Sequence, residues 1–152
     1  IHISTGMTSS DEIDSIFEFI KKRKRLKNLV LYSCVSSYPA EYKDVCLLDI
    51  KRLIQKYGKY IRAVGFSGHH RGVSIDNTTV VLGATWIERH FTFDRSAKGT
   101  DQAASLELEG FSKLKGRINN TMLALNYKPK KILKCEAFQR SYLKNVVNRE
   151  IK

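Results

Sequence analysis

Two histidines in the middle of the sequence are well suited to hold a metal ion. His69 follows an apolar segment at 61–66, and His90 stands near the end of another apolar segment at 84–91. If these segments are neighbouring parallel strands about 5 Å apart, their ends meet at one edge of a sheet and the two imidazoles can converge. Asp101, in the loop that follows, could add a carboxylate, and such a set suits a divalent cation. Spacing alone also allows each histidine to be an ordinary loop residue.

Serines stand at the ends of three apolar segments. Ser4, Ser36 and Ser67 each follow a stretch that favours a strand. Hydroxyl groups there, together with backbone N–H groups, can bind a phosphate or carboxylate. The alternative is plain turn chemistry, because serine favours loops in any case.

These residues need a scaffold of alternating strands and helices. Apolar runs predict four strands, at 1–4, 29–35, 61–66 and 84–91. Helical periodicity predicts helices between and after them, at 9–20, 44–57, 73–82 and 105–118, with a short further helix at 137–147. Four βα units imply a parallel sheet covered by helices, with functional residues at the carboxyl ends of the strands.

Three helix starts have candidate capping residues. Ser9 with Glu12 three positions later matches a capping box. Asp44 and Ser105 are the expected caps of the second and fourth helices. The stretch 73–82 is ambiguous, since its Thr and Val residues prefer strand, but the βα alternation favours a helix and we predict one.

Composition narrows the partners. The 152 residues carry a formal net charge of +12, which favours anionic partners. The densest basic run, 21–27, could be a nucleic-acid patch, but it follows a helical segment and lacks interleaved aromatics, so we predict a solvated helix end and no nucleic-acid partner.

Cysteine content and hydropathy bear on location. Three cysteines, Cys34, Cys46 and Cys135, argue against a disulfide framework and for a reducing compartment such as the cytoplasm. Cys34 lies in an apolar stretch and is most simply a small buried hydrophobic residue. No apolar run approaches the length of a membrane span, so no membrane partner is expected.

Four short motifs give the sequence a family resemblance. In order, they are 3–7 (ISTGM), 34–39 (CVSSYP), 65–69 (GFSGH) and 88–92 (ERHFT). Their order and spacing resemble the sialic acid synthase family. The resemblance implies that residues 1–118 are the last four units of a (β/α)₈ barrel of the TIM type. Residues 119–152 would then be a basic C-terminal extension or linker.

The resemblance also implies a reaction and a set of site residues. Such enzymes condense phosphoenolpyruvate with N-acetylmannosamine, or its 6-phosphate, and release phosphate. By resemblance, His69 and His90 match the ligands of Mn²⁺ or Mg²⁺, and Asp101 and Tyr38 match residues beside the sugar substrate. Ser4, Ser36 and Ser67 match positions around phosphoenolpyruvate.

Two departures from the family pattern affect these expectations. Gly68 stands where the family commonly has an aspartate, which removes a carboxylate beside the metal site. Four units also make only half a barrel, so the open sheet is expected to close against a second copy, as a homodimer, or against the other half of a longer polypeptide. A non-catalytic barrel remnant and a basic binding module remain the alternative functions.

Overall fold

A four-stranded parallel sheet forms the centre of the molecule. The computed structural model describes residues 1–150, with side chains up to residue 144. The strands are β1 (His2–Ser4), β2 (Val30–Cys34), β3 (Ala63–Gly68) and β4 (Trp86–Arg89). Their order in the sheet follows the sequence, β1-β2-β3-β4, and every pair is parallel. The α/β class and the parallel sheet expected from the sequence are confirmed.

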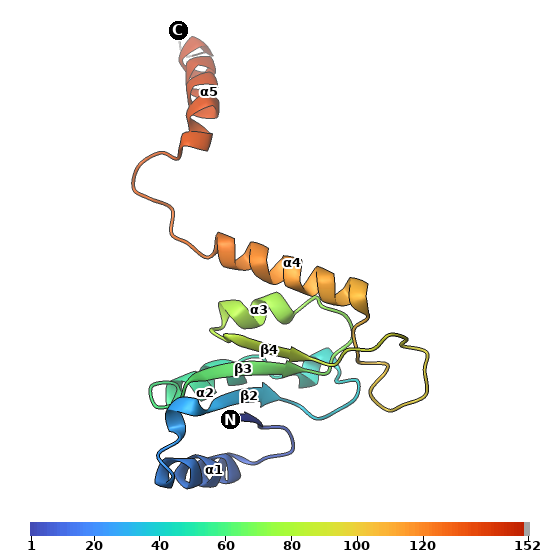
Figure 1. Cartoon of the computed structure of the whole chain (residues 1–152). Coiled ribbons are helices and arrows are strands. Elements are labelled where there is room, and N and C mark those ends of the chain that lie inside the picture. Colours follow the sequence, from blue (N-terminus) through green and yellow to red (C-terminus); the bar gives the residue numbers. More distant parts are fainter. Residues whose placement is uncertain (151–152) are drawn as a thin grey trace.

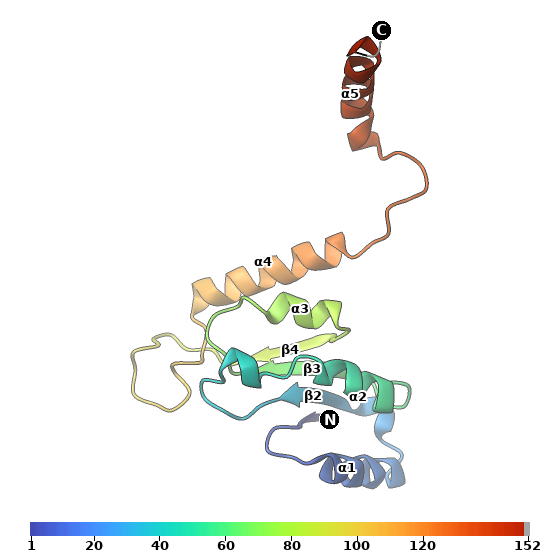
Figure 2. The ribbon, with the colours of Figure 1, turned by 180° about the vertical axis from the view of Figure 1, so that it is seen from behind.

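Helices cover one face of the sheet and leave the other open. The helices are α1 (Ser10–Lys22), α2 (Asp49–Tyr57), α3 (Asp76–Val81), α4 (Leu108–Ala124) and α5 (Ala137–Glu150), with short 3₁₀ turns at Leu26–Asn28, Tyr42–Asp44 and Lys134–Glu136. Figure 1 looks onto the open face, with α2 behind the strands, α1 below them and α3 and α4 above; α5 stands away from the sheet. The reverse view in Figure 2 brings α2 to the front.

The core lies between the sheet and the helices. Side chains alternate between the two faces of each strand, and Leu31, Val64 and Phe66 belong to the buried cluster shared with the helices. Complete burial of side chains of this size stabilises the fold by roughly 1.5–3 kcal/mol each. The residues that directly follow these three in the chain, Tyr32, Gly65 and Ser67, therefore face the open side of the sheet.

Of the three expected helix caps, one is confirmed and two are wrong. Ser9 and Glu12 form the capping box at the start of α1. Asp44 instead ends a 3₁₀ turn, and α2 begins only at Asp49, without a side-chain cap. Ser105 is buried and donates to the Asp101 carbonyl, because Leu106 continues in extended form and bridges to Phe91 before α4 can begin.

Several element boundaries differ from the expected ones. β3 runs on through Ser67 and Gly68, which the sequence placed in a loop. α4 begins at Leu108 and continues to Ala124, six residues past its expected end at 118. The ambiguous stretch contains the helix α3, as predicted, and α5 covers the helix expected at 137–147.

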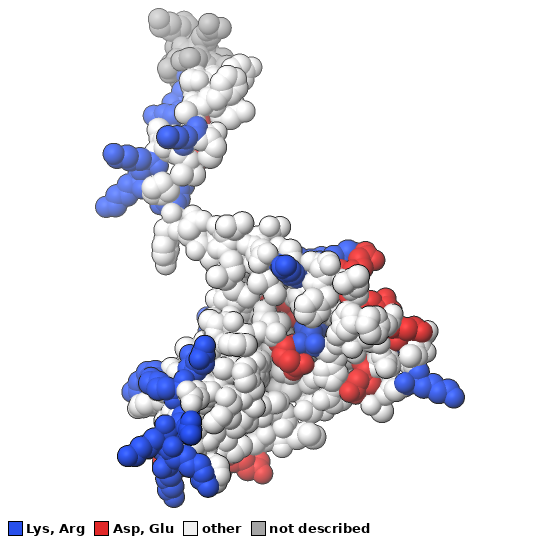
Figure 3. All heavy atoms as spheres, in the orientation of Figure 1, with Lys and Arg blue, Asp and Glu red and all other residues white. Residues whose placement is uncertain are grey.

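The basic run lies where α1 ends. Lys21 and Lys22 occupy the last turn of α1 and Arg23 is its C-cap residue. Figure 3 shows Lys and Arg gathered over this lower corner of the molecule. Within the described part of the chain, no helix has the length and apolar character needed to cross a bilayer.

We predict that this basic corner has no tight affinity for nucleic acid. Exposed lysines alone give only weak, salt-sensitive attraction to a duplex, and the Arg23 guanidinium already lies over the exposed Phe19 ring at 3.6 Å from its centroid. Fluorescence anisotropy with a random duplex at physiological salt should show equally weak binding by the wild type and by a variant with Lys21, Lys22 and Lys24 changed to Gln. Tight binding by the wild type that the variant loses would show that the run is a nucleic-acid site.

Candidate functional site

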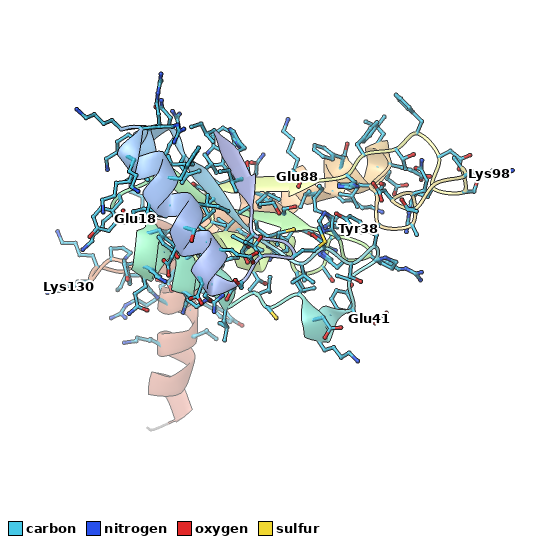
Figure 4. All side chains as sticks on the ribbon, turned by 90° about the horizontal axis from the view of Figure 1, so that it is seen from below. Glu18, Tyr38, Glu41, Glu88, Lys98 and Lys130 are labelled. Atoms are coloured by element: carbon cyan, nitrogen blue, oxygen red, sulfur yellow. The ribbon has the colours of Figure 1, made fainter. Side chains whose placement is uncertain are left out.

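The polar residues of the site come together at the carboxyl ends of the strands. Cys34 of β2 pairs with Ser67 of β3, and Ser67 pairs with Glu88 of β4. Because the register is parallel, the residues that follow each strand leave the sheet at the same level. Figure 4 shows Tyr38, Glu41 and Lys98 toward this end of the sheet, and Glu18 and Lys130 toward the other.

The structure brings His69 and His90 together. Their ring centroids are 5.0 Å apart, with the rings nearly perpendicular at 79°. His69 Nδ1 lies 2.8 Å from the carbonyl oxygen of Val35, an acceptor that places the proton on Nδ1. His90 Nδ1 lies 3.5 Å from Asp101 Oδ2. Both rings thus turn Nδ1 toward an oxygen, which leaves Nε2 of each available as a metal ligand.

This arrangement fits a metal ion in part. Metal-binding histidines usually donate their other ring N–H to a carbonyl or carboxylate, as both histidines can here. Among the described side chains, however, no group of three or more His, Cys, Asp or Glu residues is placed to hold an ion. The pair would therefore supply two ligands, with water or substrate at the remaining positions, which suits cations that retain several waters. Metal binding stays a prediction.

Tyr38 lies against both imidazoles. Its ring centroid is 4.3 Å from that of His69 and 5.7 Å from that of His90. The side chain is 41% exposed, so part of the ring is open to a ligand. Tyr38 is thus in a position to form a wall of a substrate pocket beside the histidines, and its expected role as a site residue stays a prediction.

The serines expected to bind an anion gather around Cys34. The hydroxyls of Ser4 and Ser67 lie close enough to the Cys34 thiol to lower its pKa. Ser36 lies one step further out, where its hydroxyl packs so closely on Gly6 that a Cβ at that glycine would clash with it. The three serines therefore lie around one spot next to His69, and among the described side chains no lysine or arginine hydrogen-bonds any of them.

The expectation that Cys34 is a buried hydrophobic residue is wrong. The residue is only half-buried, and its Sγ lies 3.8 Å from His69 Nδ1. Burial alone raises the pKa of the Cys34 thiol, but hydrogen bonds with His69, Ser4 and Ser67 outweigh burial and lower the pKa to about 7. The polar neighbours of Cys34 come from other strands, so its apolar flank in the sequence predicted burial alone.

The same contacts act on His69. Burial by itself lowers the pKa of the imidazole, but hydrogen bonds with Cys34 and the Val35 carbonyl, together with the nearby charge of Glu88, raise the pKa overall. In the metal-free chain, His69 and Cys34 thus each favour the other's charged form.

Glu88 is a site residue that sequence reasoning missed. Ser67 donates a hydrogen bond of 2.5 Å to Glu88 Oε2 across the open face of the sheet. The sequence could have indicated Glu88, because it directly precedes Arg89 in the strand and therefore lies on the opposite face of the sheet, two residues before His90. Without the β3–β4 register, however, its partner could not be named.

Packing around Gly68 explains why a glycine stands where the family commonly has an aspartate. Gly68 pairs with Arg89 in the register of β3 and β4. A Cβ on Gly68 would lie 2.6 Å from the Phe66 ring and 3.1 Å from Arg89 Cδ. An aspartate does not fit here unless these side chains shift.

Comparison with known proteins identifies the family. A sequence model of the NeuB family matches residues 1–130. The chain belongs to the NeuB family. N-acetylneuraminate-9-phosphate synthase of Drosophila melanogaster is 38% identical over 122 residues, which are 80% of this chain and 32% of that protein. The human synthase of the same name is 35% identical over 136 residues, covering 88% of this chain and 36% of that protein. The chain thus spans about a third of the length of these relatives.

Solved structures agree with the family and the fold. N-acetylneuraminic acid synthetase from Leptospira borgpetersenii, crystallised with citrate, superposes with a TM-score of 0.74 at 31% identity, over 93% of this chain and 48% of that one. The Bacillus subtilis spore coat polysaccharide biosynthesis protein spsE has the same fold, with a TM-score of 0.75 at 24% identity over 91% of this chain and 42% of that one. The barrel-type α/β fold expected from the sequence is confirmed for this NeuB-family chain.

The thiol of Cys34 gives a test of the site in the metal-free protein. In a background with Cys46 and Cys135 changed to Ser, alkylation of Cys34 should be half-maximal near pH 7, the value to which its pKa is lowered. His69→Gln removes the largest lowering contact, so the midpoint should rise toward about 8.5, the ordinary thiol value. Iodoacetamide labelling followed by mass spectrometry measures both profiles. Identical profiles would mean that His69 does not act on the thiol.

Proposed function

We propose that this chain forms half of the catalytic barrel of an N-acylneuraminate-type synthase. The enzyme would condense phosphoenolpyruvate with N-acetylmannosamine or its 6-phosphate and release phosphate. The names of the relatives support this class, since they are synthases of N-acetylneuraminic acid or its 9-phosphate and, in Campylobacter jejuni, of N,N'-diacetyllegionaminic acid. The observation that carries the proposal is the pair His69 and His90, each with Nδ1 facing an oxygen and Nε2 left for a ligand.

The proposed reaction joins phosphoenolpyruvate to the sugar and releases phosphate. Carbon 3 of phosphoenolpyruvate bonds to the aldehyde carbon of the open-chain sugar, and the aldehyde oxygen takes up a proton. Water adds to carbon 2, and cleavage of the bond between carbon 2 and the phosphate oxygen releases phosphate and leaves a keto acid. When bound, a divalent cation supplies Lewis-acid polarisation of the aldehyde.

The residues of the chain would orient these partners. His69 and His90 would hold Mn²⁺ or Mg²⁺, and Asp101 would keep Nδ1 of His90 protonated and its ring in place. The Tyr38 ring would form a wall against the sugar. Holding both substrates in one geometry lowers the entropic part of the barrier for bond formation.

The serines would receive phosphoenolpyruvate. Ser4, Ser36 and Ser67 surround one spot next to His69. Without substrate, the Ser67 proton is given to Glu88, so the Ser67 hydroxyl must rotate to donate to an anion. Because the Glu88 carboxylate lies close to this spot, a bound cation is needed to offset the charge of phosphoenolpyruvate.

We predict that Mn²⁺ binds between the two histidines. Isothermal titration should show binding by the wild-type chain and none by the His69→Ala, His90→Ala double variant, since both imidazole ligands are then gone. His2→Ala is the matched control, because His2 is an exposed histidine at the start of β1 that contacts Tyr32 and should not affect binding. Equal binding by the wild type and the double variant would contradict the metal site.

Turnover separates the synthase from a non-catalytic remnant. Phosphorus NMR can follow phosphate release from phosphoenolpyruvate with N-acetylmannosamine or its 6-phosphate. The assay is run with the chain alone and with the complementary part of a related barrel supplied in trans. We expect release that needs sugar, Mn²⁺ and both histidines once the complementary part is present. Metal binding with no release under either condition would favour the remnant.

The open sheet leads to a proposal about assembly. β1 and β4 each pair on one side only, and unpaired edges of buried-type strands invite association. Apolar grooves flank both edges. The groove beside β1 has a volume of about 530 Å³ and is lined by Ile3, Ile16 and Phe19, and the groove beside β4 has about 520 Å³ and is lined by Ala84, Ile87 and Ile118. We propose that two half-barrels pair β4 of one with β1 of the other, which closes the sheet.

Sedimentation equilibrium tests this arrangement. The 17.4 kDa chain should form a dimer at micromolar concentration. Phe19 is 55% exposed in the groove beside β1, so Phe19→Glu should weaken the dimer without damage to the core. A well-behaved monomer of the wild-type chain would exclude the paired half-barrel.

A further inference from the structure

A buried ion pair lies on the helix side of the sheet, directly behind the two histidines. Arg89 of β4 and Asp76 of α3 have side chains that are 0% exposed. Arg89 Nη1 lies 2.9 Å from Asp76 Oδ1 and 2.8 Å from Oδ2. His70 is equally buried, with Nε2 3.1 Å from Asp76 Oδ2. A charge pair removed from water to this degree is costly unless its hydrogen bonds are satisfied.

The proton count assigns the bonds within this cluster. Nη1 of Arg89 lies 2.8 Å from Asp76 Oδ2, 2.9 Å from the Gly72 carbonyl and 3.1 Å from His70 Nε2. Its two protons go to the two shorter contacts, which leaves none for His70. His70 Nε2 therefore carries its own proton and donates to Asp76, so the ring is oriented by the carboxylate. Among the described groups, His70 Nδ1 and Arg89 Nε are buried without a hydrogen-bond partner.

The cluster connects the backbone on either side of the histidine pair. Arg89 Nη2 donates to the His70 carbonyl at 2.6 Å, and His70 directly follows His69 in the chain. Arg89 itself directly precedes His90. On its other side, the His69 carbonyl accepts from Ala40 N at 3.1 Å, which holds this segment against the loop after β2. The guanidinium thus links the segment that carries one histidine to the strand that carries the other.

We propose that Arg89, held by Asp76, is a positioning residue that sets the separation of His69 and His90. The inference rests on the metal-binding function proposed above for the histidines and adds residues that touch neither the metal nor the substrates. Only a planar, forked donor can reach the Asp76 carboxylate, the Gly72 carbonyl and the His70 carbonyl together, so arginine is required and lysine is not equivalent.

The variant Arg89→Lys tests the proposal because it keeps the charge and loses the fork. Lysine can still neutralise Asp76, so the fold should persist, as checked by circular dichroism and thermal melting. Loss of the hydrogen bond to the His70 carbonyl should loosen the segment that carries His69 and His70. Mn²⁺ affinity by isothermal titration should then fall by about 10-fold to 100-fold, the usual effect of changing a group that orients a metal ligand.

The matched control is Arg52→Lys. Arg52 also pairs with an aspartate, Asp49, but this pair lies within α2, with side chains that are 59% and 27% exposed. This variant should bind Mn²⁺ as the wild type does. Asp76→Glu is a second test variant if Arg89→Lys does not fold, since glutamate keeps the counter-charge of Arg89 and changes where the carboxylate lies.

A second measurement does not depend on the metal. In the metal-free wild type, the ring protons of His69 and His90 should give a nuclear Overhauser effect, because the centroids are 5.0 Å apart. The effect should weaken in Arg89→Lys and persist in Arg52→Lys. If the wild type binds no Mn²⁺, the metal proposal fails, while the ring contact still decides the positioning role. A folded Arg89→Lys variant with an unchanged ring contact and unchanged Mn²⁺ affinity would overturn the inference.

Discussion

The parallel register between β3 and β4 is the constraint on which the site depends. It pairs Ser67 with Glu88 and Gly68 with Arg89, so His69 and His90 follow at the same level. A slip by one residue would turn every side chain of β4 to the other face of the sheet. Glu88 would then enter the core and Arg89 would leave it. The chemistry at the end of the sheet is therefore fixed by backbone pairing before any contact between the site residues is made.

The alternation of β4 divides three consecutive residues among three environments. Glu88 reaches the open face and accepts from Ser67, Arg89 turns into the helix layer toward Asp76, and His90 leaves the strand toward Asp101. The buried Arg89 also stabilises the register of β4, since loss of one partner of a buried ion pair costs about 3–5 kcal/mol. A sheet that paired β4 wrongly would leave Arg89 or Asp76 without its counter-charge. The ion pair and the register thus support each other.

Features that depend on adjacent residues could be predicted from the sequence, whereas features that depend on distant contacts could not. The capping box of Ser9 and Glu12 involves four adjacent residues, and the structure has it as predicted. Asp44 failed as a cap because Val45 is drawn into the core and Cys46 adopts a positive φ of 53°, so the chain cannot enter a helix there. Ser105 failed because the Leu106 amide pairs with the His90 carbonyl. Both failures come from contacts or backbone turns that local patterns do not contain.

The candidate site likewise has features that the sequence predicts and features that depend on distant contacts. The apolar runs and their βα spacing were sufficient to place His69 and His90 at one edge of the sheet. The polar surroundings of Cys34 were not predictable, because Ser4, Ser67 and His69 reach it from β1, from β3 and from the loop after β3. The role of Asp76 was equally hidden, since its partner Arg89 lies thirteen positions away on another element. Cross-strand contacts need the register, which the sequence alone left open.

The net charge of the chain and the charge of the site are separate quantities. The composition, at +12, favours anionic partners, yet the lysines and arginines at the end of α1 lie at the other end of the strands from the histidines. The five residues of β2 alone span roughly 17 Å. This is about twice the screening length of about 8 Å at physiological ionic strength. The basic corner therefore contributes little to the potential at the site, where Glu88 and Asp101 add negative charge beside the imidazoles. The anionic substrate proposed above would therefore depend on positive charge brought to the histidines themselves, which the proposed cation between His69 and His90 would supply.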